Sequence, residues 1–144
     1  MFRILIADDS QSVRLILKDF LALRSDVEVC GEAVNGAEAV QKARALAPDL
    51  VLMDLAMPEM NGAEATSVLK RAMPELSVIL FTMYAENIGR QLTSAIGVDA
   101  VLCKRDGMTQ LGKVIDTMLR SGPALDNPGP HKQLQWKANR KAAD

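Results

Sequence analysis

The sequence lacks several features, and each absence excludes a class of protein. Its formal net charge is only −1 over 144 residues, so it offers no bulk electrostatic attraction for nucleic acid. No apolar stretch approaches the roughly 20 residues that a membrane-spanning helix needs. The apolar start of the chain is too short for a signal peptide and runs into Asp8 and Asp9. We therefore expect a cytoplasmic protein that contacts neither membranes nor nucleic acid directly.

The chain has few cysteines and lacks a glycine-rich phosphate-binding loop. The two cysteines, Cys30 and Cys103, do not have metal-ligand spacing. We expect both to be free, buried thiols in a reducing compartment. No Gly-rich phosphate loop is present, so we do not expect the chain to hold a nucleotide.

The composition and its change along the chain predict one domain with a tail. Hydrophobic residues make up 49% of the chain and charged residues 24%, which suits a packed globular domain. After Gly122-Pro123 the sequence becomes basic and polar, with helix-breaking residues at its start. We predict a domain over residues 1–122 and a disordered tail over residues 123–144. An alternative is a short helix that places Leu134 and Trp136 on a partner.

Apolar segments and segments of helical periodicity alternate along the domain. Strands are expected at 3–7, 26–33, 50–54, 78–82 and 98–103, the second with the alternation of an edge strand. Helices are expected at about 10–23, 39–46, 62–73, 86–96 and 111–119, with Asn35-Gly36 as a turn. This alternation predicts an α/β fold, a doubly wound parallel sheet with helices on both faces. We adopt the strand order 2-1-3-4-5 known for flavodoxin-like folds, which separates the two cysteines.

Polar residues follow four of the five predicted strands. Asp8 and Asp9 follow the first strand, Asp54 ends the third, Thr82 ends the fourth and Lys104 follows the fifth. In the adopted order these four strands are neighbours, and ligands bind at the carboxyl ends of parallel strands. Each residue alone has an ordinary explanation, such as capping a loop or a helix. Their coincidence at one edge predicts a single site.

The residue types at this edge suit phosphoryl transfer. Clustered carboxylates raise the pKa of one member unless a cation lies among them, and oxygen ligands suit Mg²⁺ or Mn²⁺. A carboxylate-bound metal beside a lysine and a threonine would neutralise a transferring phosphoryl group. A carboxylate nucleophile would then take that group from an external donor.

The ordered set of these residues resembles the receiver domain of two-component response regulators over residues 1–122. It comprises Asp8-Asp9, the D-x-x-M-P-x-M-x-G loop that starts at Asp54, Thr82 and Lys104. The resemblance implies that Asp54 accepts a phosphoryl group from a histidine kinase or phosphotransfer protein. It implies Mg²⁺ on Asp9, Asp54 and the carbonyl of Ala56, with Asp8 acting through water. Thr82 and Lys104 would each bind a phosphoryl oxygen.

Three positions depart from the family pattern. Val101 stands where the family usually has a switching aromatic residue, Arg105 where it often has proline, and Met83 where a small residue is usual. Val101 is too short to swing between two surfaces, so we expect a smaller conformational response to phosphorylation. Tyr84 could replace the missing ring, although a partly exposed loop tyrosine is the simpler expectation.

Several functions are compatible with this resemblance. We expect a phospho-acceptor signalling protein rather than an enzyme with an external substrate, either a monomer or a weak dimer that regulates an unidentified partner by docking. One alternative is the receiver part of a DNA-binding transcriptional regulator. Two others are a flavodoxin-like cofactor binder, which Asp8 and Asp9 disfavour by repelling phosphate, and a metal-dependent hydrolase.

Overall fold

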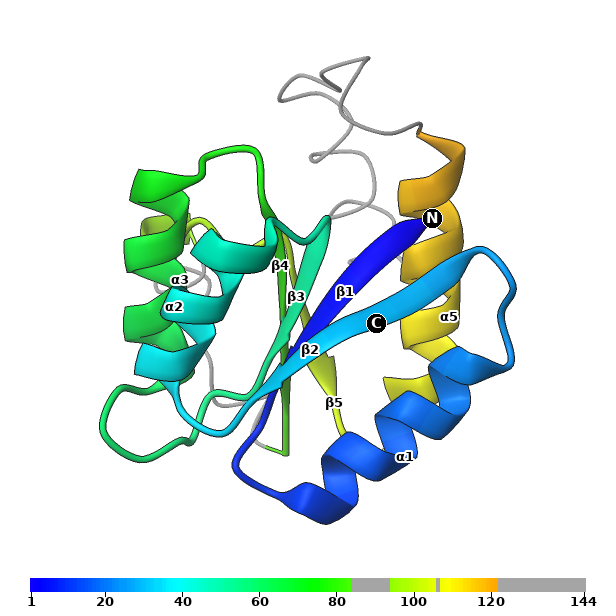
Figure 1. Ribbon diagram of the computed structural model, residues 1–144, viewed down its shortest axis with the longest axis horizontal. Coiled ribbons are helices and arrows are strands. Elements are labelled where there is room, and N and C mark those ends of the chain that lie inside the picture. Colours follow the sequence, from blue (N-terminus) through cyan, green and yellow to red (C-terminus); the bar gives the residue numbers. More distant parts are fainter. Residues whose placement is uncertain (84–93, 106, 122–144) are drawn as a thin grey trace. The chain divides into compact units, whose positions relative to one another are not determined.

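A computed structural model describes residues 1–83, 94–105 and 107–121 of the chain (Figure 1). It divides into one unit over residues 1–105 and a second from residue 106 onward, and each is described by itself. The expected helix at 86–96 falls mostly outside the described residues. Tyr84 and the expected tail at 123–144 also lie outside them.

The first unit is built on a five-stranded parallel sheet. Its strands are β1 (Phe2–Ala7), β2 (Val27–Ala33), β3 (Leu50–Met53), β4 (Ser77–Thr82) and β5 (Ala100–Cys103). The order is β2-β1-β3-β4-β5, which confirms the predicted topology. Every neighbouring pair is parallel, so the carboxyl ends of all five strands meet at one edge. The order also puts Cys30 and Cys103 on opposite edge strands. Both are free, as expected, but the expectation that they are buried was wrong, because each lies on an edge strand and is only partly buried.

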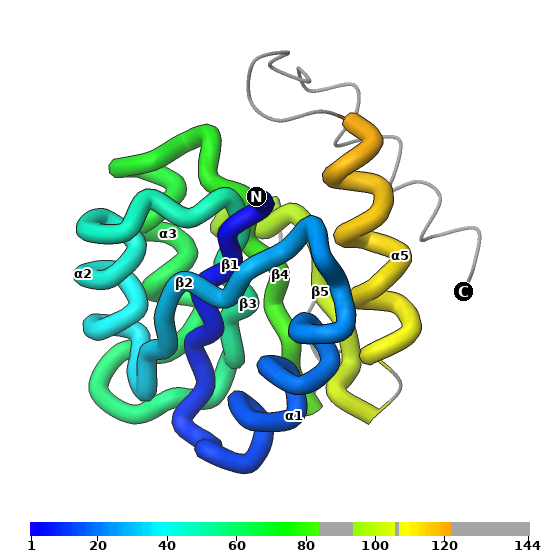
Figure 2. Tube along the Cα trace, turned by 45° about the vertical axis from the view of Figure 1, so that its right-hand side comes forward, coloured from blue at the N-terminus to red at the C-terminus, as the bar shows by residue number. Residues whose placement is uncertain are grey.

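Helices cover both faces of this sheet, as predicted. Three helices of the first unit lie wholly within the described residues: α1 (Gln11–Ala22), α2 (Gly36–Leu46) and α3 (Gly62–Ala72). Helices α2 and α3 lie side by side over one face, and α1 lies over the other (Figures 1 and 2). The central strand β3 is therefore buried over its whole length, as expected for a strand covered on both sides. None of the helices in the described part of the chain could span a membrane.

Polar side chains cap the beginnings of α1, α2 and α3. Ser10, Asn35 and Asn61 each accept a hydrogen bond from the backbone N–H three residues ahead, which satisfies a donor that has no partner within the helix. The prediction that Asn35-Gly36 forms a turn was therefore wrong. Asn35 caps α2, and Gly36 is its first residue because the capping side chain stabilises helical geometry there.

The edge strand β2 does not keep a regular alternation of buried and exposed side chains, because its register with β1 shifts by one residue. Ile4 pairs with Val29 but Leu5 pairs with Gly31, which leaves Cys30 as an extra residue. An extra residue moves the following side chains to the opposite face of the sheet. Ala33 is consequently buried and Cys30 packs against the core. A two-residue period read from the sequence cannot reveal such a bulge.

The ends of two other strands also differ from the predictions. Strand β5 begins at Ala100 rather than at Val98, because the buried Asp99 turns its carboxylate towards a backbone donor. Oδ2 of Asp99 accepts hydrogen bonds of 2.8 Å from Val78 N and from Lys70 Nζ. Strand β3 ends at Met53, so Asp54 is the first residue beyond it.

The second unit contains helix α5 (Gly107–Arg120). This helix begins earlier than the expected helix at 111–119. Its apolar residues recur at helical spacing, and Leu111 and Ile115 are buried.

Candidate functional site

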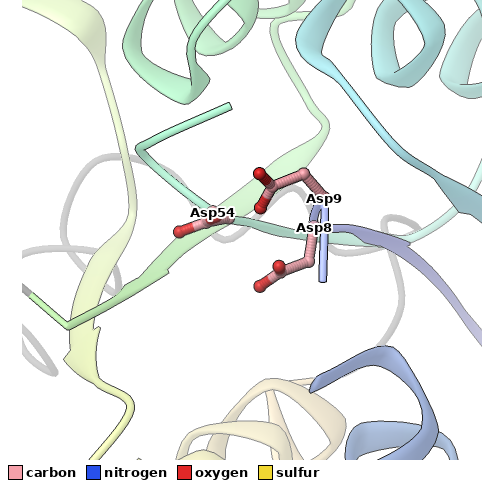
Figure 3. Close-up of side chains that lie close together, drawn as sticks. All are labelled: Asp8, Asp9 and Asp54. Atoms are coloured by element: carbon pink, nitrogen blue, oxygen red, sulfur yellow. The ribbon is translucent and has the colours of Figure 1, made fainter. Parts of the chain in front are cut away.

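Three carboxylates converge at the carboxyl edge of the sheet. Asp8 and Asp9 follow β1, Asp54 follows the neighbouring strand β3, and their side chains point toward a common region (Figure 3). One oxygen of each carboxylate lies within 4.8 Å of the others. Asp8 is only 2% exposed and Asp54 5%, whereas Asp9 is exposed to solvent. The predicted convergence of these three residues is thus present in the structure.

Lys104 reaches the same cluster from the end of β5. Its Nζ lies 2.6 Å from Oδ2 of Asp8 and 3.3 Å from Oδ1 of Asp54, and its side chain is 13% exposed. Thr82 ends β4 and is buried, and its carbonyl accepts a 3.0 Å hydrogen bond from the Lys104 N–H. Ala56 is exposed two residues beyond Asp54. The predicted roles of Thr82 and of the Ala56 carbonyl stay predictions.

The electrostatics of the cluster follow from burial and like charge. Burial and the neighbouring carboxylate of Asp8 raise the pKa of Asp54 from 3.8 to about 6, although Lys104 opposes the shift. Burial acts to lower the pKa of Lys104, but hydrogen bonds and charge from Asp8 and Asp54 outweigh it and raise that pKa. Each ionised group therefore depends on its neighbours for stabilisation.

The donor set fits a divalent cation with a preference for oxygen ligands. Three ionised carboxylates and one ammonium leave a formal charge of −2 at the site. A divalent cation would neutralise that charge, and carboxylate oxygens without nitrogen or sulfur ligands favour Mg²⁺ or Mn²⁺. Asp9 is the exposed member of the cluster and lies beside the two buried carboxylates.

The loop after Asp54 depends on a glycine whose role the sequence did not reveal. A Cβ atom on Gly62 would lie 2.1 Å from the carbonyl oxygen of Asp54. The Gly62 N–H also donates a 2.9 Å hydrogen bond to the Leu55 carbonyl, and Met57, a residue of the loop, is buried. Glycine thus allows α3 to begin directly against the backbone of Asp54. The glycine in the loop motif was visible, but its contact partner was not.

The backbone of the β1–α1 loop is held from several sides. Asp8 N donates to the Ala33 carbonyl at 3.0 Å, and Oδ1 of Asp8 accepts from Ser10 N at 2.8 Å. The carbonyl oxygen of Asp8 accepts a 2.7 Å hydrogen bond from Nη1 of Arg14. No feature of the sequence pattern had singled out Arg14.

The positions that depart from the family pattern have ordinary surroundings. Val101 is partly buried and packs against the core, and Met83 is 44% exposed. Arg105 is exposed, and its Nε lies 3.4 Å from Sγ of Cys103. A valine packed against the core is consistent with the expectation that it does not act as a swinging switch.

The doubly wound parallel sheet and the acidic cluster at its carboxyl edge define the class of this protein. The chain belongs to the response regulator receiver domain family, whose model matches residues 4–116. It is a receiver domain of the kind that takes part in two-component phosphorelays.

Individual relatives agree with this assignment. The response regulator protein VraR of Staphylococcus saprophyticus is 37% identical over 115 residues, which cover 78% of this chain and 54% of VraR. VraR of Staphylococcus aureus strain Mu3 is 39% identical over 102 residues, covering 71% of this chain and 49% of that protein. The chain therefore spans about half the length of the curated relatives it matches.

Solved structures agree as well. The response regulator domain of Thermotoga maritima CheB is 29% identical with a TM-score of 0.74, and the match covers 88% of this chain and 98% of that one. Thermotoga maritima TrrA in complex with Mg(2+)-BeF is 28% identical with a TM-score of 0.73, with coverage of 81% and 97%.

The contact between Gly62 and Asp54 predicts a local packing defect. Gly62→Ala should lower the free energy of unfolding by about 2 to 3 kcal/mol, because the new methyl group overlaps a backbone oxygen that cannot move freely. Urea denaturation would measure this loss. Gly31→Ala is the matched control, since its Cβ would meet the flexible end of Leu46 at 2.8 Å. A similar loss in both variants would contradict the prediction.

The raised pKa of Asp54 predicts that this residue destabilises the metal-free protein. The folded pKa of about 6 exceeds the ordinary value of 3.8, so the unfolding free energy should fall as pH rises from about 4 to about 6. In EDTA at pH 7.5, Asp54→Asn should gain about 1 to 3 kcal/mol, since one pKa unit corresponds to about 1.4 kcal/mol. Denaturation at pH 3.5, which lies below both the folded pKa of about 6 and the ordinary value of 3.8, should show a much smaller gain. An equal gain at both pH values would contradict the electrostatic cause.

Proposed function

We propose that this receiver domain accepts a phosphoryl group on Asp54. The observation that supports this most directly is the position of its buried carboxylate, 5% exposed, with Lys104 Nζ at 3.3 Å and two further carboxylates beside it. A nucleophilic carboxylate needs nearby positive charge to meet a negatively charged phosphoryl group. Lys104 supplies one such charge from the protein itself.

The proposed phosphoryl transfer is a nucleophilic displacement at phosphorus. An oxygen of Asp54 attacks the phosphorus atom and forms an acyl phosphate. The bond between phosphorus and the donor's histidine nitrogen breaks, and the imidazole keeps the electron pair. In this proposal Lys104 pairs with one phosphoryl oxygen and the hydroxyl of Thr82 with another, so both stabilise the charge that develops on the transferring group.

We assign the metal requirement to the acidic cluster. Asp9, Asp54 and the carbonyl of Ala56 would hold Mg²⁺, with Mn²⁺ as a substitute, and Asp8 would act through water. When bound, the ion would neutralise charge on the phosphoryl oxygens. Asp8 is already engaged by Lys104 and by Ser10 N, which supports an indirect role for its carboxylate.

This chemistry indicates the class of phosphodonor and the kind of output, but not the individual proteins. The donor would be a sensor histidine kinase or a phosphotransfer protein, and turnover would be limited to autocatalytic transfer and dephosphorylation. The output would be a changed docking surface. The alternative is an attached DNA-binding domain, and it is supported by the greater length of the VraR relatives. Retention of promoter DNA by the full natural protein would favour that alternative.

Labelling with a small phosphodonor tests the acceptor. Acetyl phosphate with Mg²⁺ should add one phosphoryl group to the wild type and none to Asp54→Asn, as measured by intact mass. Asp49→Asn is a matched control, because Asp49 lies before β3, at the opposite end of the strand from Asp54, and it should be labelled normally. Labelling of Asp54→Asn at the wild-type level would place the acceptor elsewhere.

Metal binding should depend more on Asp9 than on Asp8. Asp9→Ala removes the expected direct ligand and should weaken Mg²⁺ binding about tenfold or more, within the range seen when metal-site residues are altered. Asp8→Ala should have a smaller effect. The Mg²⁺ dependence of the labelling rate would measure both, and EDTA should stop labelling of the wild type. Unchanged affinity in Asp9→Ala would show that the metal binds at another place.

A further inference from the structure

Arg14 connects helix α1 to the peptide that carries two of the three site carboxylates. Its Nη1 donates a 2.7 Å hydrogen bond to the Asp8 carbonyl, and its Nε donates a 3.1 Å hydrogen bond to Oε1 of Glu32 on β2. The Arg14 side chain is only 13% exposed. The Arg14 guanidinium therefore bridges the β1–α1 loop and the neighbouring edge strand β2.

The accepting oxygen belongs to the peptide unit between Asp8 and Asp9. A peptide unit is planar, so fixing its carbonyl also fixes the direction in which the chain enters Asp9. The preceding peptide is already held by the bond from Asp8 N to the Ala33 carbonyl. Together these contacts leave little freedom for the backbone from which both carboxylates project.

Glu32 keeps the guanidinium in this orientation. Its carboxylate also lies 3.1 Å from Nζ of Lys18, and hydrogen bonds from Lys18 and Arg14 lower its pKa despite some desolvation. A planar guanidinium can donate in two directions at once, whereas an ammonium cannot reproduce that fixed geometry. The arrangement thus requires arginine rather than a generic positive charge.

We propose that Arg14 is a positioning residue for the metal site. Its hydrogen bond to the Asp8 carbonyl sets the directions in which the Asp8 and Asp9 side chains point. This inference rests on the proposed assignment of Mg²⁺ to the acidic cluster. Arg14 does not touch the reacting atoms. Its loss changes the affinity for the cation because the ligands are no longer held in the binding geometry.

The sign of the effect separates positioning from simple charge. If Arg14 acted only as a nearby positive charge, its removal would strengthen cation binding by removing repulsion. A positioning role predicts weaker binding. Lys18 is a matched control, since it is on the same helix and pairs with the same Glu32 carboxylate at the same 3.1 Å distance.

Titration with Mn²⁺, followed by the electron paramagnetic resonance signal of the free ion, provides a test that does not depend on activity. Arg14→Met should raise the Kd for Mn²⁺ about tenfold, as expected when a group that orients metal ligands is lost. Arg14→Lys should also weaken binding, because it keeps the charge but loses the two-directional geometry. Lys18→Met should stay within about twofold of the wild type, as for an exposed ion pair. Circular dichroism in EDTA confirms that each variant is folded.

Each outcome supports or overturns the inference. Unchanged or tighter Mn²⁺ binding by folded Arg14→Met would overturn it, as would equal weakening by Lys18→Met. If Arg14→Met does not fold, Glu32→Ala provides the same test by removing the acceptor of the Arg14 Nε hydrogen bond, and an unchanged Kd there would overturn the inference. Failure of the wild type to bind Mn²⁺ or to be labelled would instead refute the proposed function. A wild type that binds Mn²⁺ while Arg14→Met binds it equally well would refute only the role of Arg14.

Discussion

The repulsion among three carboxylates at one edge of the sheet is the constraint on which the rest of this site depends. Asp8 and Asp54 are almost fully buried, and burial disfavours their charged forms. Lys104 compensates in part, at 2.6 Å from one carboxylate and 3.3 Å from the other. The remaining negative charge suits the site to a divalent cation with oxygen ligands. The energetic cost of the cluster to folding is therefore linked to its chemistry.

The surrounding backbone holds these charges in place. Gly62 lets α3 begin against the Asp54 carbonyl, and Ser10 N engages the Asp8 side chain. Arg14 holds the peptide between Asp8 and Asp9 from the side of α1. Rigid support of this kind keeps ligands within the narrow geometry that metal binding and phosphoryl transfer require. The site thus depends on contacts from the loop before α3, from the β1–α1 loop and from helix α1.

The departure at Val101 is the one that leads us to expect a smaller response to phosphorylation. Val101 packs against the core instead of presenting a ring that can move between two surfaces. Such a side chain changes its environment little when it moves, so it contributes little free-energy difference between two states.

The sequence by itself determined the alternation of strands and helices and the set Asp8, Asp9, Asp54, Thr82 and Lys104, because buried strands leave continuous apolar runs and polar residues at their ends are conspicuous. Strand order came from a known class, and the structure confirmed it. Tertiary structure alone decided the bulge at Cys30. It also decided the approach of Gly62 to Asp54 and the reach of Arg14 to the Asp8 carbonyl. These contacts join residues from different elements, and no local periodicity or propensity records which distant backbone atom a side chain will meet.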